Sequence, residues 1–184
     1  MAQHPINVRL SRSDLARAEQ AGSLRYQLAR ASGVKDRLID TSRSGKEADL
    51  PGIKAEIAVA KLLDIEFDAT ALGIDNGCDL YMNDGHSEVA IQVKSCHKRN
   101  AKWMLGTPHA KANWDLAVFV MPTFEDDLME VVGWIPITTY KALEETVDLG
   151  HGPGTGVRIE RLFNMEQLWR QISKRRSKRN AAWL

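Results

Sequence analysis

The stretch CDLYMNDGHSEVAIQVKSC, residues 78–96, predicts a β-hairpin with one polar face. Two runs rich in apolar residues flank Asn83-Asp84-Gly85-His86, a sequence typical of tight turns. A two-residue loop at Asp84-Gly85 and a four-residue loop from Asn83 to His86 both lead to one register. That register pairs residue 82 with 87, 80 with 89 and 79 with 90.

The side chains of this hairpin separate by alternation, because successive residues of a strand point to opposite faces. The polar face is expected to carry Asp79, Ala90, Gln92 and Lys94. The apolar face is expected to carry Val89, Ile91 and Val93. A three-residue loop would instead move Asp79 to the apolar face.

A further acidic residue lies upstream, in the helix predicted for GIKAEIAVAKLLD, residues 52–64. The helical period places Glu56 on the stripe formed by Ile53, Ile57, Ala60 and Leu63. The solvated edge of the helix is expected at Lys54 and Lys61. A carboxylate among apolar side chains requires a partner such as a metal ion or a cation. Two carboxylates, an amide oxygen and an ammonium that converge indicate a site for a hard divalent cation.

The order of these polar residues resembles a known family. Glu56 in a helix, Asp79 at the start of a strand and Gln92-Val93-Lys94 in the next strand are similar to the motif of the PD-(D/E)XK nuclease superfamily. Gly52-x-x-Ala55-Glu56 resembles the small-x-x-small-Glu opening of many members. The resemblance covers residues 46–137 at most. It implies an α/β fold with a restriction-endonuclease-like αβββαβ core, a mixed central sheet flanked by helices, and N- and C-terminal helical extensions.

The resemblance also implies a role for each site residue. Asp79 is the expected central ligand of Mg²⁺ or Mn²⁺, with further oxygens from the Gln92 side chain and the Val93 backbone carbonyl. Glu56 is expected to coordinate through water or to hold a second cation. Lys94 is expected to orient or deprotonate the attacking water. Most members carry Asp or Glu where this chain has Gln92, which leaves the site one negative charge poorer, although Gln-x-Lys variants are known.

Basic residues cluster in two places where a phosphate backbone is expected to bind. The first cluster follows the catalytic strand directly and contains Lys98, Arg99 and Lys102. The second lies in the C-terminal tail and contains Lys174, Arg175, Arg176, Lys178 and Arg179. The predicted N-terminal helix, opened by Ser11 or Ser13, adds further arginines.

The 184 residues, 43% of them hydrophobic, favour a single nuclease domain with one core. Its parts are an N-terminal helical extension (1–45), the catalytic core (46–137) and a C-terminal extension with the basic tail (138–184). The helix of Glu56 is expected within 47–63, and further helices are expected at 12–31, 138–147 and 165–179, with a short one within 100–114. Further strands are expected at 65–70, 115–121 and 131–137, and a flexible glycine-rich loop at 150–156.

The composition of the chain indicates the cellular compartment in which this domain is expected. No apolar run approaches the length of a membrane span, and the N-terminus has no hydrophobic signal core. Cys78 and Cys96 have no zinc-site spacing. These features favour the cytoplasm of a bacterial, archaeal or phage-infected cell, without a membrane partner.

Two functions are compatible with these residues. The first is a metal-dependent endonuclease that hydrolyses DNA phosphodiester bonds, of the restriction, homing, junction-resolving or phage type. It is expected to act as a homodimer, because cutting both strands of a duplex requires two sites. The alternative is a catalytically inactive nucleic-acid-binding protein on the same fold, with Gln92 as the trace of lost activity.

Overall fold

The computed structural model describes residues 4–31, 45–69, 78–83, 87–106, 113–148 and 153–181. Its helices are α1 (Arg12–Ala31), α2 (Gly45–Leu63), α3 (Ile137–Leu143) and α4 (Met165–Ala181), with a 3₁₀ turn at Ile159–Arg161. Its strands are β1 (Ile6–Arg9), β2 (Leu80–Asn83), β3 (Glu88–Ser95), β4 (Trp103–Gly106), β5 (Leu116–Pro122), β6 (Leu128–Pro136), β7 (Glu145–Asp148) and β8 (Pro153–Arg158).

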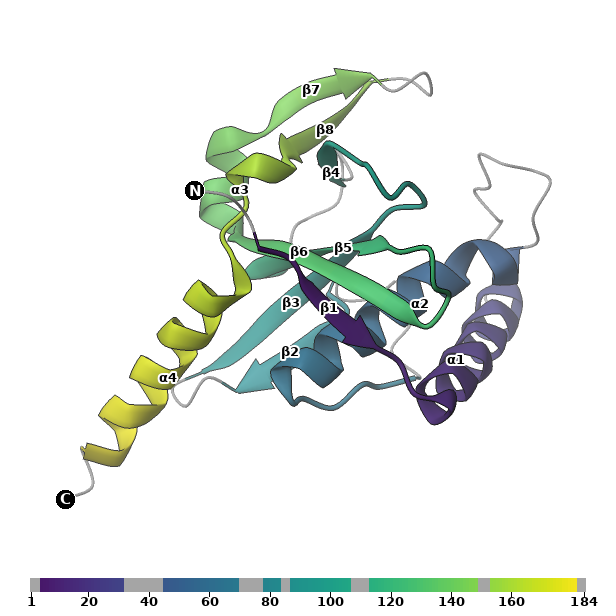
Figure 1. Cartoon of the computed structure of the whole chain (residues 1–184), viewed down its shortest axis with the longest axis horizontal. Coiled ribbons are helices and arrows are strands. Elements are labelled where there is room, and N and C mark those ends of the chain that lie inside the picture. Colours follow the sequence, from purple (N-terminus) through teal and green to yellow (C-terminus); the bar gives the residue numbers. More distant parts are fainter. Residues whose placement is uncertain are drawn as a thin grey trace.

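These strands form two sheets, a large one in the order β1-β6-β5-β3-β2 and a small one in the order β4-β8-β7. In the large sheet β3 and β5 run parallel, and the other neighbours run antiparallel. Figure 1 shows the small sheet to one side of the large one, with α1 and α2 beside each other and α4 leading away toward the C-terminus. The expectation of an α/β fold with a mixed sheet is confirmed at this level.

The two faces of the large sheet bury different partners. Leu116, Val118 and Val120 belong to a core shared with α1, α2 and α4. Ala117, Phe119 and Met121, which alternate with them, belong to a second core shared with α3 and the small sheet. Because both faces of β5 are covered, the strand is buried along nearly its whole length, as its continuous apolar run predicts.

Helix α1 begins where its sequence predicts. The Ser11 hydroxyl accepts a hydrogen bond from the Asp14 N–H at 3.1 Å, and the Asp14 carboxylate accepts one from the Ser11 N–H at 2.8 Å. This reciprocal cap satisfies two N–H groups that the first turn leaves without helical partners. A Cβ atom on Gly22 would lie 3.4 Å from the Ile53 side chain, so small residues allow α1 to pack closely on α2.

The prediction of a strand at 65–70 is wrong for residues 65–69, which form no strand. Thr70 lies outside the described residues. Asp64 adopts a positive φ of 53°, and the Ile65 N–H bonds back to the Ala60 carbonyl at 3.0 Å. This is a Schellman-type end to α2, which stops the helix at Leu63. Phe67 then packs beneath Arg17 and Arg25, whose guanidinium carbons lie 5.6 and 5.8 Å from its ring centroid.

Three further sequence predictions, all for residues in or next to the small sheet, differ from the structure. The described part of the short helix expected within 100–114 contains strand β4, and the glycine-rich segment expected as a loop contains β8 from Pro153 onward. The helix expected at 138–147 ends at Leu143, and β7 follows. A Cβ atom on Gly156 would lie 3.1 Å from Leu105 Cδ2 and 3.6 Å from Trp103 Cε3. The lack of a side chain at Gly156 therefore allows Leu105 and Trp103 of β4 to lie across β8, a contact without a local sequence pattern.

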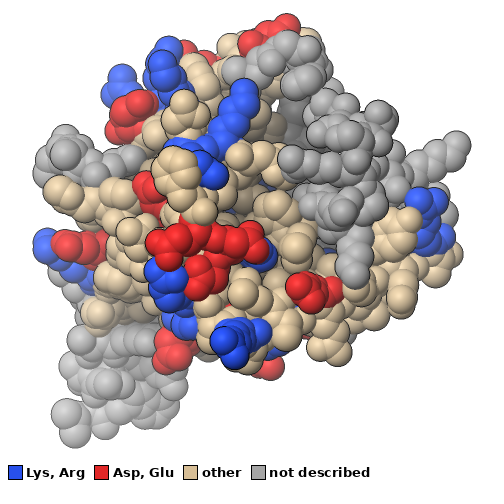
Figure 2. All heavy atoms as spheres, turned by 45° about the vertical axis from the view of Figure 1, so that its right-hand side comes forward, with Lys and Arg blue, Asp and Glu red and all other residues tan. Residues whose placement is uncertain are grey.

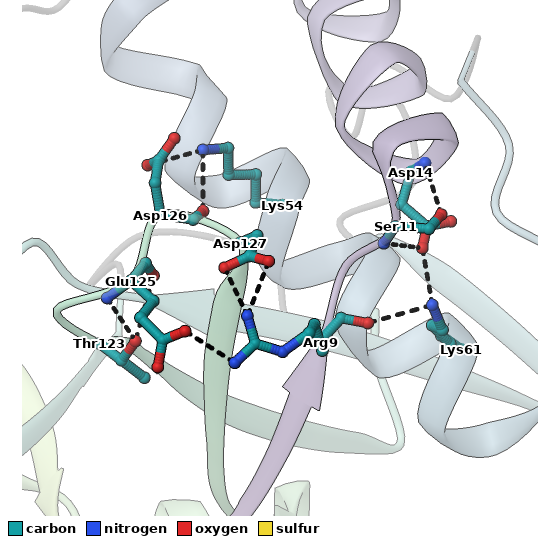
Figure 3. Close-up of polar contacts among 9 residues, drawn as sticks. All are labelled: Arg9, Ser11, Asp14, Lys54, Lys61, Thr123, Glu125, Asp126 and Asp127. Carbon is teal, nitrogen blue, oxygen red and sulfur yellow. Dashed lines mark hydrogen bonds and ion pairs between the residues drawn. The ribbon is translucent and has the colours of Figure 1, made fainter.

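The turn between β5 and β6 is tied to β1 and α2 by ion pairs (Figure 3). Arg9 donates to Asp127 at 2.8 and 3.0 Å and to Glu125 at 2.7 Å. Lys54 pairs with Asp126 at 2.9 Å. Only 8% of Lys54 is exposed, so its expected place on a solvated edge is wrong. Helix α2 is covered by both α1 and the large sheet, which leaves little of it in solvent.

Within the described ranges, no helix combines the length and the apolar character that crossing a bilayer demands.

Candidate functional site

The hairpin of β2 and β3 forms in a register two residues away from the predicted one. Leu80 pairs with Ile91 and Met82 with Val89, and residues 84–87 connect the strands. Because side chains alternate with a period of two, this shift leaves every side chain on its predicted face. Ile91 and Val93 are buried toward α2, while Gln92 and Lys94 lie on the face that carries Ala117 and Phe119 in neighbouring β5.

Asp79 lies where β2 departs from regular pairing with β3. Its N–H donates to the Ile91 carbonyl at 2.9 Å, although a continued ladder would place Asp79 opposite Gln92. The Val93 N–H donates instead to the Asp79 carboxylate, at 2.7 Å from Oδ2. The carboxylate thus replaces a backbone acceptor at the start of β2, which fixes its position beside β3.

The Gln92 amide joins Asp79 to the backbone of β3. Its Nε2 donates to Asp79 Oδ2 and, at 3.4 Å, to the Val93 carbonyl oxygen. Three predicted metal ligands therefore converge, with the amide NH₂ placed between the two oxygen acceptors. Rotation of the amide by half a turn would present its oxygen at the same place. The resulting set of carboxylate, amide and carbonyl oxygens matches the preference of Mg²⁺ and Mn²⁺.

Lys94 and Asp79 carry opposite charges in a shared, poorly solvated environment. Burial lowers the pKa of Lys94, and the charge of Asp79 only partly offsets this effect. Burial raises the pKa of Asp79, against the Val93 N–H and the charges of Lys94 and Arg25, which lower it. A lysine with a lowered pKa is a better proton acceptor near neutral pH, and paired shifts of this kind concentrate at functional sites.

Glu56 has the cationic partner that its apolar surroundings require, and that partner is Arg25 of α1. Arg25 Nη1 and Nη2 donate to the two carboxylate oxygens at 2.9 and 2.6 Å. Only 14% and 9% of the two side chains are exposed. Glu56 belongs to α2, which packs on the opposite face of the large sheet from Gln92 and Lys94. The structure therefore groups Asp79, Gln92 and Lys94, with Glu56 connected to Asp79 through the charge of Arg25.

The sequence interpretation counted Arg25 only among the basic residues of the N-terminal helix and missed its pairing with Glu56. It stands one turn beyond the buried residues Ala18, Ala21 and Gly22 on the same stripe of α1. A guanidinium that continues a stripe of small residues faces the neighbouring helix, and this spacing is the signal that could have identified it.

The carboxylates of the site are few. In the part of the chain that the structure describes, no group of three or more His, Cys, Asp and Glu residues is arranged to hold a metal ion. Asp75, a spare carboxylate before the hairpin, lies outside the described residues. A cation at Asp79 would therefore depend on neutral oxygens and on water for most of its ligands.

The basic residues after β3 form an exposed segment. Lys98, Arg99 and Lys102 are exposed, and Arg99 Nε donates to the Thr123 carbonyl oxygen at 2.9 Å. The tail residues are part of α4, but their side chains lie outside what the structure describes; they are Lys174, Arg175, Arg176, Lys178 and Arg179.

A groove of about 610 Å³ lies elsewhere, between α4, β6 and the hairpin. Met82, Val89, Trp134 and Ile172 contribute to its lining, and none of the candidate site residues does. The candidate site and this groove are thus separate features.

No protein-family model, curated protein or solved structure matches this chain.

Proposed function

We propose that this chain is a metal-dependent endonuclease that hydrolyses DNA phosphodiester bonds. The observation that carries the proposal is the convergence of the Asp79 carboxylate, the Gln92 amide and the Val93 carbonyl oxygen. The ammonium of Lys94 lies on the same face, with its pKa lowered by burial. An oxygen-rich cation site beside a lysine supplies the two kinds of group that phosphodiester hydrolysis needs.

Each residue has a role in this proposal. A bound Mg²⁺ would stabilise the charge on the phosphoryl oxygens and favour ionisation of water. Asp79, the rotated Gln92 amide and the Val93 carbonyl oxygen would hold it. Lys94 would orient the attacking water and, as the neutral amine that burial favours by lowering its pKa, accept a proton from it. Glu56 would act more remotely, through Arg25, by setting the electrostatic potential at Asp79.

The finer fold assignment belongs to the same proposal. The succession of helix α2, the hairpin and the parallel neighbour β5 supports a restriction-endonuclease-like core. The lack of a strand at 65–69 and the presence of β4 before β5 depart from the expected αβββαβ order. We therefore propose a modified core of this type rather than a standard one.

One observation favours the alternative, an inactive nucleic-acid-binding protein. Glu56 is neutralised by Arg25, and the Gln92 NH₂ group satisfies Asp79. A site whose carboxylates are already satisfied by protein donors has less need of a metal ion. The two functions differ in whether a divalent cation displaces these donors.

The deciding experiment measures metal binding and cleavage on the same protein. Wild type, Asp79→Asn and Lys94→Met are titrated with Mg²⁺ and Mn²⁺ by calorimetry, and each is incubated with a panel of duplex, branched and single-stranded DNA. Lys141→Met, an exposed lysine on α3, is the matched control. We expect metal-dependent cleavage by wild type and the control, loss of cleavage in both site variants, and loss of metal binding in Asp79→Asn.

A different outcome would support the alternative, an inactive nucleic-acid-binding protein. In that case wild type binds no Mg²⁺ or Mn²⁺ and cleaves no member of the panel, yet retains DNA in a gel-shift assay. Normal cleavage by Lys94→Met or Asp79→Asn would remove that residue from the proposed site.

A homodimer is part of the proposal for duplex substrates, because one chain supplies one site. Light scattering with and without duplex DNA tests it. A protein that stays monomeric on DNA and only nicks the duplex would exclude a symmetric dimer as the working form.

A further inference from the structure

The aromatic ring of Phe124 is exposed to solvent and stacks against the side chain of an arginine. It lies in the β5–β6 turn and is 88% exposed. The guanidinium carbon of Arg99 lies 3.7 Å from the ring centroid, and Arg99 is fixed in turn by its bond to the Thr123 carbonyl oxygen. One face of the ring is therefore covered by a cation, and most of the remaining surface is open to water. An exposed, oriented ring of this kind suits stacking.

A second stack of the same type lies on the small sheet. The guanidinium carbon of Arg158 is 4.5 Å from the centroid of Trp103. The two residues are direct partners in the antiparallel pair of β4 and β8, so the sheet register sets the stack. The Ile159 N–H bonds to the Lys102 carbonyl oxygen at 3.1 Å, which fixes the backbone beside Trp103.

One short segment joins the two stacks to the candidate site. Arg99 and Trp103 are four positions apart in the chain, so their α-carbons are at most about 14 Å apart. Lys98 and Lys102 are exposed within or next to this span. The segment begins just after Lys94, at the end of β3, and runs to the small sheet (Figure 1).

The acidic residues of the β5–β6 turn offset only part of this positive charge, because Arg9 and Lys54 pair with them and leave one net negative charge among the three carboxylates. Glu125 and Asp127 bind Arg9, and Asp126 binds Lys54 (Figure 3). Figure 2 shows one face of the molecule, on which acidic side chains gather in a central group with basic side chains close to them. Lys98, Arg99 and Lys102 therefore remain to attract phosphates.

We propose that this surface, formed by the Arg99–Phe124 stack, the Arg158–Trp103 stack and the lysines between them, binds single-stranded DNA. Unpaired bases expose their faces and can stack on Phe124 and Trp103, whereas the bases of an intact duplex cannot. Lys98 and Lys102 bind the phosphates. The inference rests on the proposed function in one respect, since it names unpaired DNA as the substrate class that the surface leads toward Lys94.

The test measures binding alone, in EDTA, so that it does not depend on cleavage. Fluorescence anisotropy compares a labelled oligothymidylate with a duplex of the same length, for wild type, Phe124→Leu and Trp103→Leu. Leucine keeps an apolar side chain and removes the stacking ring. The matched control is Tyr26→Leu, since Tyr26 also lies under an arginine, Arg30 at 5.1 Å, but belongs to α1, which contributes no residue to this surface.

We expect each surface variant to weaken oligothymidylate binding about ten-fold or more, the size of effect that loss of one stacked base produces. Duplex binding should change much less, and Tyr26→Leu should bind as wild type does. Melting curves confirm that each variant is folded. Unchanged oligothymidylate affinity in both surface variants, equal losses for duplex and single strand, or no binding by wild type would each overturn the inference. A protein that binds as expected but never cleaves with metal would overturn the proposed function alone.

Discussion

The guanidinium of Arg25 and the carboxylate of Glu56 join α1 to α2 through two parallel hydrogen bonds, at 2.9 and 2.6 Å. Both groups are largely shielded from water, so neither can be removed without leaving a buried charge. The N-terminal helix is thereby connected to the electrostatics of the candidate site, since the charge of Arg25 lowers the pKa of Asp79.

Arg25→Met should destabilise the fold by about 3 to 5 kcal/mol, because it leaves the Glu56 carboxylate buried without this cation. Urea unfolding measures the change. Arg170→Ala, which removes an exposed pair within α4, should alter the free energy of unfolding by less than about 1 kcal/mol. Equal stability of Arg25→Met and wild type would show that the pair does not hold α1 on α2.

Lys94→Met should make the protein more stable at neutral pH and reduce cleavage about a hundred-fold or more. The lowered pKa of Lys94 means that folding disfavours its ammonium, and methionine removes that penalty. The penalty is relieved as pH rises toward the ordinary pKa of 10.5, so the advantage of the variant should shrink there. Thermal unfolding of both proteins at several pH values measures this difference in stability. A variant less stable than wild type at pH 7 would contradict this.

Asp79→Asn should likewise exceed wild type in stability at pH 7, with the opposite dependence on pH. The folded state raises the pKa of Asp79, so it binds this proton more tightly than the unfolded chain does. Wild type should therefore gain stability relative to the variant as pH falls from the raised pKa to the ordinary 3.8. Parallel melting curves of the two proteins, from neutral pH down to that value, give the difference. A difference in stability between the two proteins that does not change with pH would contradict the raised pKa of Asp79.

Gln92→Glu should strengthen the response to Mg²⁺. Without metal, the new carboxylate faces Asp79 where the amide NH₂ now donates, so the two charges repel each other. A divalent cation relieves this repulsion, and the variant should show a larger rise of melting temperature with Mg²⁺ than wild type does. Gln92→Leu, which keeps bulk but has no oxygen, should respond less than wild type. Identical responses in all three proteins would place the cation elsewhere.

Gly133→Ala should destabilise β6 by about 1 to 3 kcal/mol. A Cβ atom there would lie 2.5 Å from the Phe163 carbonyl oxygen, a backbone atom with little freedom to move. Gly154→Ala is the matched control, because the nearest atom to its Cβ would be 3.8 Å away. Urea unfolding should show a lower free energy of unfolding than that of wild type for Gly133→Ala but not for Gly154→Ala.

The sequence predicts those parts of the fold that depend on strong periodic patterns. The apolar run of β5 and the cap at Ser11 specify their elements locally, and the shared face of Gln92 and Lys94 follows from alternation. Asp79 precedes the regular part of β2 and reaches Gln92 through its side chain. The exact register does not follow from alternation, because a shift of two residues preserves every face.

The remaining errors have a common cause in tertiary contacts. Strand β8 is rich in glycine, but it pairs with both β4 and β7, and Leu105 and Trp103 of β4 lie close to its Gly156. The apolar residues after α2 resemble a strand, but a left-handed residue at Asp64 directs Phe67 to α1. The ion pair of Glu56 required a partner from a helix outside the expected core.

Val93 participates in the candidate site without its side chain. Its N–H bonds to Asp79 and its carbonyl oxygen accepts from Gln92, while the isopropyl group is buried in the core beneath α2. A scan of alanine substitutions would register Val93 only as a packing residue, since alanine keeps both backbone groups. Sequence variation at this position is therefore free to follow the needs of the core, and relatives of this protein could preserve the site while showing no conserved residue between Gln92 and Lys94.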